Sequence, residues 1–327
     1  MKSNNIFLIA IVSIVLISGC AANAPFATTS NVTTTSNVTT TTLASTTTTI
    51  PEFEIVATGV SAYSAGSDSI YFMTSEATDG KLMKASKDGN SKAEIAKGFG
   101  GATVLNLVDD SDYIYFTHEL INGIGKFMRV AKADGKVEEI YSCNPNTKGR
   151  IYSVGEFVYL LPEKGTLCRM KKPALASDGN FRVSTVSPGT NMVFDSNAAY
   201  FLDSTWIKKA TIAGKFEIST LVSEISQSNL VFDADNVFWI NLAGNLNRIA
   251  TAANSKTAIL LSGVKSKDIA SDGKSIFISN EASIDALVKT GGTPAVFAKT
   301  SAAAEKLSVD AGYLYWIEAG NLKRKKI

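Results

Sequence analysis

The sequence predicts an all-β fold: a β-propeller of seven four-stranded antiparallel blades, with six or eight blades as alternatives. Three observations predict it. A short apolar and aromatic segment recurs seven times, its recurrences are about 40 residues apart, and the segment that would complete the seventh unit stands before the first. A period near 40 residues is the size of one four-stranded propeller blade.

The recurring segment is predicted to be the second strand of each blade, and it carries an aromatic ring at its centre. The spacings between these rings are 44, 44, 41, 38, 39 and 38 residues. Five of the rings follow an aspartate by five positions, where a carboxylate suits a tight turn between antiparallel strands. The rings belong to Tyr71, Tyr115, Tyr159, Tyr200, Phe238, Phe277 and Tyr315, and the aspartates are Asp110, Asp195, Asp233, Asp272 and Asp310.

A basic third strand and a short fourth strand complete each predicted blade. Third strands such as Lys126–Val130 alternate in character, which is typical of one packed and one solvated face. A turn such as Asp88-Gly89 follows, and fourth strands such as Val137–Ile140 and Phe216–Ile218 close the units. The basic C-terminal run Lys323–Lys326 completes the last third strand, and we expect it on a solvated edge.

The two ends of the repeat region predict a closed ring. The seventh unit ends at Ile327 after its third strand, and the missing fourth strand is Phe53–Ala57, which is similar to Ala93–Ala96. A first strand that completes the last blade leaves only short, protected edges. Closure favours seven blades, in a domain that covers residues 53–327.

Each unit thus combines a loop aspartate, an aromatic strand and a basic strand. The clearest aromatic strands are Tyr315-Trp316-Ile317-Glu318 and Tyr115-Phe116-Thr117-His118. This unit resembles the YWTD-type and TolB-like propeller repeats of extracellular proteins, over residues 53–327. No unit preserves the full YWTD tetrad, and YWTD propellers have six blades. The resemblance implies the architecture and a surface that binds partners, without a particular ligand.

Residues 1–19 are interpreted as a lipoprotein signal peptide. The nearly all-apolar run Ile6–Ile17 would span about 18 Å as a helix, too short for a bilayer core of about 30 Å. It ends in Ile17-Ser18-Gly19-Cys20, which resembles the lipobox of prokaryotic lipoproteins. The resemblance implies cleavage before Cys20 and lipidation of its thiol; the alternative is an ordinary secretory signal. Both place the chain outside the cytoplasm, at the cell membrane or in the periplasmic or extracellular space.

Residues 20–52 are expected to form a linker after the lipidated cysteine. Thirteen threonines lie between Thr28 and Thr49, and such a tract lacks the apolar surface that would offset the entropy of ordering. Asn31 and Asn37 begin Asn-Val-Thr triplets that match the N-glycosylation pattern, although such triplets arise easily in threonine-rich sequence.

Composition excludes several classes of function. The chain of 327 residues has 32 Lys+Arg and 30 Asp+Glu, so its formal charge of +2 excludes a nucleic-acid partner bound by bulk charge. A single histidine, His118, and three cysteines exclude most histidine-based catalysis and any multi-cysteine metal cluster. We expect no cofactor.

Cys143 and Cys168 could form a disulfide outside the cytoplasm; otherwise they remain two free thiols.

Candidate binding residues lie in the loops between the second and third strands of the blades. Six of the seven units place a carboxylate there, and the fifth unit places an asparagine. These side chains could form a ring around the channel mouth and hold a cation or a basic partner. The favoured alternative is that these side chains form hydrogen bonds within and between blades. The candidates are Glu76, Asp79, His118, Glu119, Glu163, Asp203, Asn241, Glu281 and Glu318.

Two classes of function remain open. The first is a monomeric, membrane-anchored surface lipoprotein whose propeller binds a protein, a glycan or an envelope component without catalysis. The second is an envelope hydrolase or lyase with a metal-assisted site at the propeller mouth. Three or more loop carboxylates within about 5 Å of one point would favour the second class.

Overall fold

The computed structural model describes residues 53–76, 78–100, 104–119, 125–140, 149–162, 165–173, 175–183, 191–203, 206–212, 217–266 and 268–327. The chain divides into two units, 1–48 and 49–327, and every described residue belongs to the second. The expected signal peptide, Cys20, the threonine-rich linker, Asn31 and Asn37 lie outside the described residues. Within the described ranges, no helix has the length and apolarity that crossing a membrane requires.

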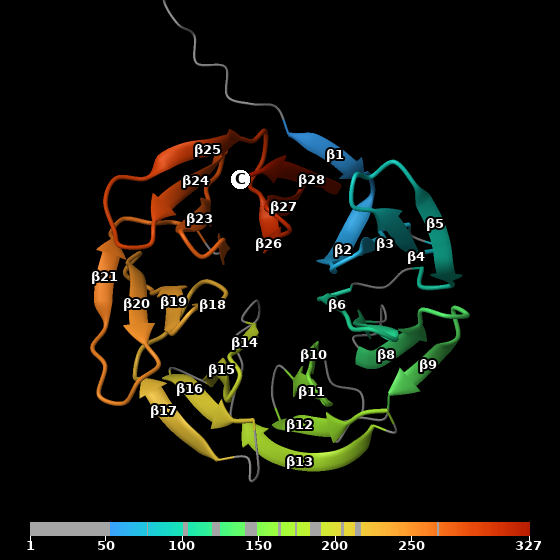
Figure 1. Ribbon diagram of the computed structural model, residues 1–327, viewed down its shortest axis with the longest axis horizontal. Coiled ribbons are helices and arrows are strands. Elements are labelled where there is room, and N and C mark those ends of the chain that lie inside the picture. The colour runs from blue at the N-terminus through green and yellow to red at the C-terminus, as the bar shows by residue number, and fades with distance from the viewer. Residues whose placement is uncertain are drawn as a thin grey trace, which may run out of the picture. The chain divides into compact units, whose positions relative to one another are not determined.

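The described strands form seven four-stranded antiparallel sheets, which are the blades of one ring (Figure 1). The predicted seven-bladed β-propeller is therefore confirmed. The first strand of each blade lies nearest the centre of the ring and the fourth lies at the rim (Figure 1). Each of the seven buried hydrophobic clusters draws side chains from two neighbouring blades, so the core is a ring of inter-blade layers.

The blades follow one another along the chain. Blade 1 comprises β2 (Val60–Ala65), β3 (Ser69–Thr74), β4 (Lys81–Ser86) and β5 (Lys92–Lys97). Blade 2 comprises β6 (Leu107–Asp109), β7 (Tyr113–Glu119), β8 (Gly125–Ala131) and β9 (Val137–Ile140). Blade 3 comprises β10 (Gly149–Val154), β11 (Phe157–Pro162), β12 (Gly165–Lys171) and β13 (Ala176–Val183). Blade 4 comprises β14 (Met192–Phe194), β15 (Ala198–Asp203), β16 (Trp206–Thr211) and β17 (Ile218–Val222).

The last three blades include the two ends of the ring. Blade 5 comprises β18 (Val231–Asp233), β19 (Asn236–Ile240), β20 (Leu246–Ala250) and β21 (Ala258–Leu261). Blade 6 comprises β22 (Ile269–Ser271), β23 (Ser275–Ser279), β24 (Ser283–Val288) and β25 (Ala295–Lys299). Blade 7 comprises β26 (Glu305–Asp310), β27 (Tyr313–Glu318), β28 (Asn321–Lys326) and β1 (Glu54–Ala57).

The second strands carry the buried aromatic rings that the repeat predicted. All seven central rings are buried, at 5% exposure or less. The outer strand of blade 4 differs from its prediction: it begins at Ile218 and continues to Val222, which pairs with Ile207, and residue 216 lies outside the described part.

Ring closure occurs as predicted. The N-terminal strand β1 pairs antiparallel with the C-terminal strand β28, with Glu54 opposite Arg324 and Ile55 opposite Lys323. The Nε of Arg324 donates a hydrogen bond of 2.7 Å to Glu54 Oε2, and its Nη1 donates to the carbonyl of Lys87 in blade 1. Arg324 of β28 thus contacts both β1, which closes its own blade, and the next blade along the ring.

The expectation of a solvated C-terminal strand is wrong. Lys323, Arg324 and Lys325 are only 7%, 6% and 7% exposed. Lys323 pairs with Glu318 of its own blade, and Lys325 donates to the carbonyl of Phe297 in blade 6. Arg324 makes a contact that recurs around the ring, in which a third-strand cation reaches a main-chain carbonyl of the next blade. The donor and acceptor pairs are Arg129 and Pro173, Arg169 and Ile212, Lys209 and Thr251, Arg248 and Lys289, and Arg324 and Lys87.

The recurrent aspartates form two kinds of contact. In Asp110, Asp195 and Asp272, the Oδ1 atom accepts two main-chain N–H groups of the following turn, as predicted. Asp233 and Asp310 form ion pairs with lysines of the next blade, as Asp110 also does with Lys172, and each of the two is followed by an alanine in the left-handed conformation. The predicted hairpin turn after β4 is also present, with Gly89 at a φ of +75° that a side chain would strain.

A candidate binding face at the channel mouth

The loops that join second to third strands, and the loops that lead into each first strand, lie at the same end of the blades, because the strands alternate in direction. We call this end of the propeller the upper face. The turns that join first to second and third to fourth strands form the opposite face. The candidate residues of the second-to-third loops therefore belong to the upper face.

Two of the candidates are buried parts of the scaffold. Glu318 is 1% exposed, lies 3.0 Å from the ammonium of Lys323, and accepts hydrogen bonds from the N–H and hydroxyl of Ser301. Burial opposes its ionisation, but these hydrogen bonds outweigh that cost and lower the pKa of Glu318 to about 2. Asn241 is buried too, and its Oδ1 accepts the N–H groups of Ala243 and Asn245 in its own turn.

The other candidates do not gather into one site. Glu76 and Glu281 are exposed, and Asp79 and Asp203 are partly buried on different blades. Glu163 and the side chain of Glu119 lie outside the described residues. Among the described residues, no three His, Cys, Asp or Glu side chains are placed to hold a metal ion.

His118 packs into its blade. Its ring lies 5.9 Å from the ring of Phe99 in an edge contact, and within the described part of the chain its buried Nε2 has no hydrogen-bond partner. Burial lowers the pKa of His118 below its ordinary value, so the imidazole is neutral at pH 7.

Cys168 is a buried, disulfide-bonded residue of β12. Cys143 lies outside the described residues, so its pairing with Cys168 stays a prediction.

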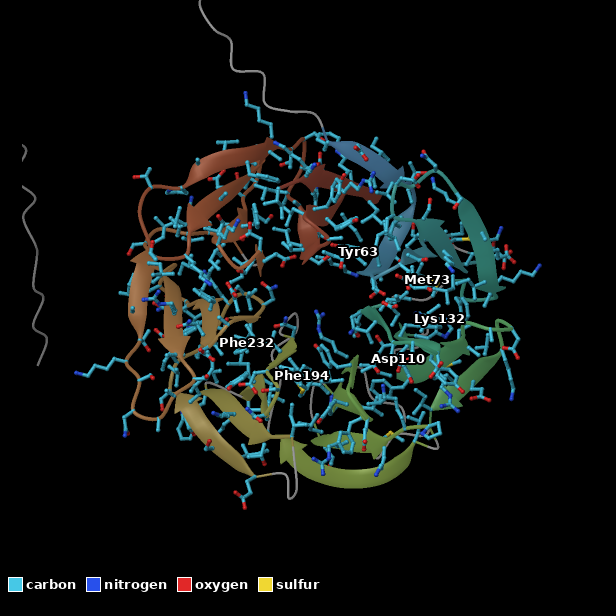
Figure 2. All side chains as sticks on the ribbon, viewed as in Figure 1. Tyr63, Met73, Asp110, Lys132, Phe194 and Phe232 are labelled. Atoms are coloured by element: carbon cyan, nitrogen blue, oxygen red, sulfur yellow. The ribbon has the colours of Figure 1, made fainter. Side chains whose placement is uncertain are left out.

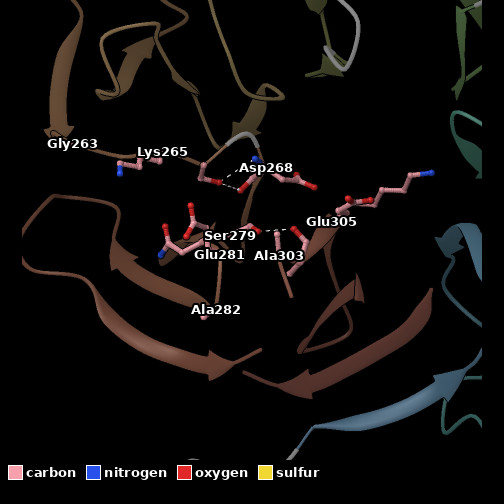
Figure 3. Close-up of a pocket in the computed structure, with 12 residues that line it drawn as sticks. Gly263, Lys265, Asp268, Ser279, Glu281, Ala282, Ala303 and Glu305 are labelled. Carbon is pink, nitrogen blue, oxygen red and sulfur yellow. Dashed lines mark hydrogen bonds between the residues drawn. The ribbon is translucent and has the colours of Figure 1, made fainter. Parts of the chain in front are cut away.

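A cleft of about 700 Å³ opens on the upper face between blades 6 and 7 (Figure 3). The loop into blade 6, the β23–β24 loop and the loop into blade 7 line it, with small side chains such as Ala282 and Ala303. Ser279 joins blade 6 to the loop into blade 7 by donating to the carbonyl of Ala304, and Ser266 donates within its own loop to the carbonyl of Asp268. Figure 3 places Lys265 toward one end of the cleft and Glu305 toward the other.

A second cavity, of about 310 Å³, lies at the ring axis and is lined by residues of all seven blades. Tyr63 borders it from blade 1 (Figure 2). Asp268 and Lys306 line both the channel and the cleft, so the two cavities share a wall. This arrangement follows from the repeat, because the residue at the start of each first strand faces the axis.

Asparagine side chains join neighbouring blades around this channel. Asn106 donates from Nδ2 to the carbonyl of Ile151 at 2.6 Å and accepts its N–H at 3.1 Å. Asn191 and Asn229 contact the main chain of the next blade in the same way. We call each of these contacts an asparagine bridge. Each stands in for a strand-to-strand pair between adjacent first strands.

Three charged residues occupy the same repeat position in other blades. They are Arg150 in blade 3, Asp268 in blade 6 and Lys306 in blade 7. Asp268 accepts the N–H of Leu307 at 3.0 Å, and burial raises its pKa to about 7. Lys306 donates to the carbonyls of Ser61 and Val104, and burial and then the nearby Arg150 charge lower its pKa to about 8.

Sequence reasoning missed these channel residues although a signal was present. Each lies nine positions before the central ring of its blade, next to the apolar position eight before it. The residue type changes between blades at this position, so the pattern of shared residues did not reveal it.

The upper face also carries two exposed apolar side chains on adjacent blades. Trp206 begins β16 in blade 4 and is 45% exposed, and Leu242 lies in the β19–β20 loop of blade 5 and is 64% exposed. The remaining large apolar side chains that are exposed in the described residues lie on outer strands, at the end of β24 or at the C-terminus.

Comparisons with known proteins agree with this architecture. No protein-family model matches the chain, and no curated protein matches it in sequence. Among solved structures, it is similar to BamB from Moraxella catarrhalis, with a TM-score of 0.59 and 14% identity over 82% of this chain and 83% of that one. It is also similar to PorZ of Porphyromonas gingivalis, described as an essential bacterial surface component of the type-IX secretion system, with a TM-score of 0.57 and 13% identity. That match covers 84% of this chain and 37% of PorZ. At these identities the likeness concerns the fold.

Proposed function

We propose that this chain is a surface lipoprotein, anchored through Cys20, whose propeller binds a protein partner on its upper face without catalysis. The observation that carries the proposal is the exposure of Trp206 and Leu242 on adjacent blades of the face that holds both cavities. Large apolar side chains that a monomer leaves exposed, aromatic ones above all, are typical of the buried centre of a protein interface.

The organisation of the chain supports this proposal. A lipid on Cys20 and a threonine-rich linker would hold the propeller away from the membrane, where its upper face can meet a partner. PorZ, a surface component of a secretion system, contains a region of similar fold that makes up 37% of its chain. The described loop carboxylates favour binding over metal-assisted hydrolysis, because Glu318 serves the scaffold and the others are spread over blades 1, 4 and 6.

Site-specific photo-crosslinking tests the docking face. A benzoylphenylalanine at position 242 or 206 of the full chain should crosslink to a discrete protein in the cell envelope. Matched controls in the same blades are positions 253 and 196, which are exposed in turns of the opposite face. Equal crosslinking from both faces, or none from positions 206 and 242, would contradict the proposal.

Fractionation tests the anchor separately. Cys20→Ser should move the full chain out of the membrane fraction, because one thiol carries the lipid. If the variant remains with the membrane as the natural chain does, the anchor is not at Cys20.

A further inference from the structure

The channel contains two cations that no carboxylate in the described part of the chain pairs with. Arg150 and Lys306 both line the 310 Å³ cavity, and neither forms an ion pair there. The ammonium of Lys306 contacts only main-chain carbonyls, 2.6 Å from Ser61 O and 3.3 Å from Val104 O. Buried or half-buried cations are ordinarily paired, because desolvation is costly.

The remaining polar groups of the channel wall are already engaged. Asn106, Asn191 and Asn229 use their amides in the asparagine bridges. The Tyr63 hydroxyl contacts Lys306 and Ser308, and the Tyr152 hydroxyl accepts the N–H of Met192 at 2.9 Å. The Arg150 guanidinium also contacts the Tyr152 hydroxyl, and the Lys306 ammonium donates to two carbonyls. The remaining N–H groups of these two cations are therefore the donors left to meet a ligand.

We propose that the channel mouth binds a small oxyanion, a carboxylate- or phosphate-type group, between Arg150 and Lys306. A guanidinium provides the planar, multidentate donor set that such oxyanions match. The volume of about 310 Å³ is at the small end of ligand sites and would hold an anion with several waters. This site goes beyond the docking of a protein partner on Trp206 and Leu242 and does not depend on it.

Asp268 is the one carboxyl group that lines the channel in the described residues. Its pKa is raised to about 7, so it is only partly ionised at neutral pH and leaves the wall with a net positive charge. Arg150 and Lys306 lie close enough for the Arg150 charge to lower the pKa of Lys306, and an anion between them would relieve that repulsion.

Anion affinity should therefore fall as the pH rises from 6 to 9. Over that range Asp268 ionises near pH 7 and Lys306 loses its proton near pH 8. A guanidinium is not deprotonated in proteins. Burial raises the pKa of Tyr63 and Tyr152, so both stay neutral, and Glu305 is an exposed residue of the neighbouring cleft.

Calorimetric titration of the full chain with sulfate in chloride-free buffer tests the site. Sulfate keeps its charge from pH 6 to 9, so any pH dependence belongs to the protein. Saturable binding should weaken about tenfold or more in Arg150→Met, because hydrogen bonds to a charged group are lost. Lys265→Met is the matched control, since Lys265 lines the neighbouring cleft and not the channel; its affinity should equal that of the natural chain.

A second variant keeps the test decisive if Arg150→Met folds poorly. Asp268→Asn removes the competing carboxylate, so it should bind sulfate more tightly than the natural chain at pH 8 and equally well at pH 5. Succinate probes a free organic anion, and an acetylated tetraglutamate probes a carboxylate-bearing chain. Binding of any probe that depends on Arg150 supports the proposal. Failure of all three probes, affinity unchanged in Arg150→Met, or weaker binding by Asp268→Asn would overturn it.

Discussion

Asp268→Asn should stabilise this protein at alkaline pH. Asp268 occupies the repeat position at which Asn106, Asn191 and Asn229 form asparagine bridges to the next blade. Its carboxylate accepts the N–H of Leu307, but an ionised carboxylate cannot donate to a carbonyl as the asparagines do. An amide at this position would restore the donor and remove a buried charge.

The magnitude follows from the pKa of Asp268, which burial raises from 3.8 to about 7. A raised carboxyl pKa means that the stability this group contributes is fully present below pH 3.8 and is lost as the pH rises through 7. The ionised carboxylate then costs about 4 kcal/mol at pH 8, as an upper limit, but only about 0.5 kcal/mol at pH 4. For a domain of this size, about 4 kcal/mol is a Tm difference of roughly 8 °C or more.

Thermal unfolding of the full chain, followed by circular dichroism at pH 4 and pH 8, measures this effect. Asp268→Asn should raise Tm by about 5–10 °C at pH 8 and change it little at pH 4. Asp272→Asn is the control in the same blade, because an amide oxygen can accept the same two N–H groups of its turn. The reasoning is refuted if Asp268→Asn lowers Tm at pH 8, or if its gain is the same at both pH values.

Three further predictions concern the scaffold and the docking face. Glu318→Gln should cost about 3–5 kcal/mol, measured by denaturant unfolding, because it leaves the buried Lys323 unpaired. The pKa of Glu318 is lowered to about 2, so its contribution is present above pH 4.5 and lost as the pH falls through 2; a pH-independent loss in the variant would contradict this. Arg324→Met should lower Tm by several degrees, because it removes the contacts to Glu54 and Lys87, and an unchanged Tm would show that these contacts do not stabilise closure. Trp206→Ser with Leu242→Ser should abolish the envelope crosslink while Tm changes by less than about 2 °C, and a large fall in Tm would assign these side chains to the scaffold.

The architecture was predictable because its signals are periodic. The ring residues such as Tyr115 and Tyr315 recur at a nearly constant spacing, and each is buried between blades. The similarity of Phe53–Ala57 to Ala93–Ala96 predicted closure because both are outer strands, and outer strands of all blades meet the same requirements.

The basic strands show where sequence reasoning failed. A run such as Lys323–Lys326 looks solvated when each charge is considered alone. In the ring, Arg324 lies 4.6 Å over the centroid of the Tyr313 ring and donates to the next blade, so it is satisfied without solvent. That partner belongs to another repeat, more than 200 residues away, and cannot be inferred from the local pattern.

The candidate site was the least predictable part. The loop carboxylates were candidates because they recur. In a repeat protein, however, a recurring residue often stabilises the repeated unit, as Glu318 does through its contacts with Ser301 and Lys323. The channel residues Arg150, Asp268 and Lys306 differ from the asparagines at the equivalent positions. That these three residues line one cavity is apparent only in the folded ring, which brings them together at its axis.

Amide hydrogen exchange at residues 54–57 of the full chain tests ring closure most directly. Pairing of β1 with β28 predicts that these amides are protected as strongly as those of the outer strand β5, and that Arg324→Met speeds their exchange while leaving β5 unchanged. Exchange at the rate of an unfolded peptide in the natural chain would contradict a closed seven-bladed ring.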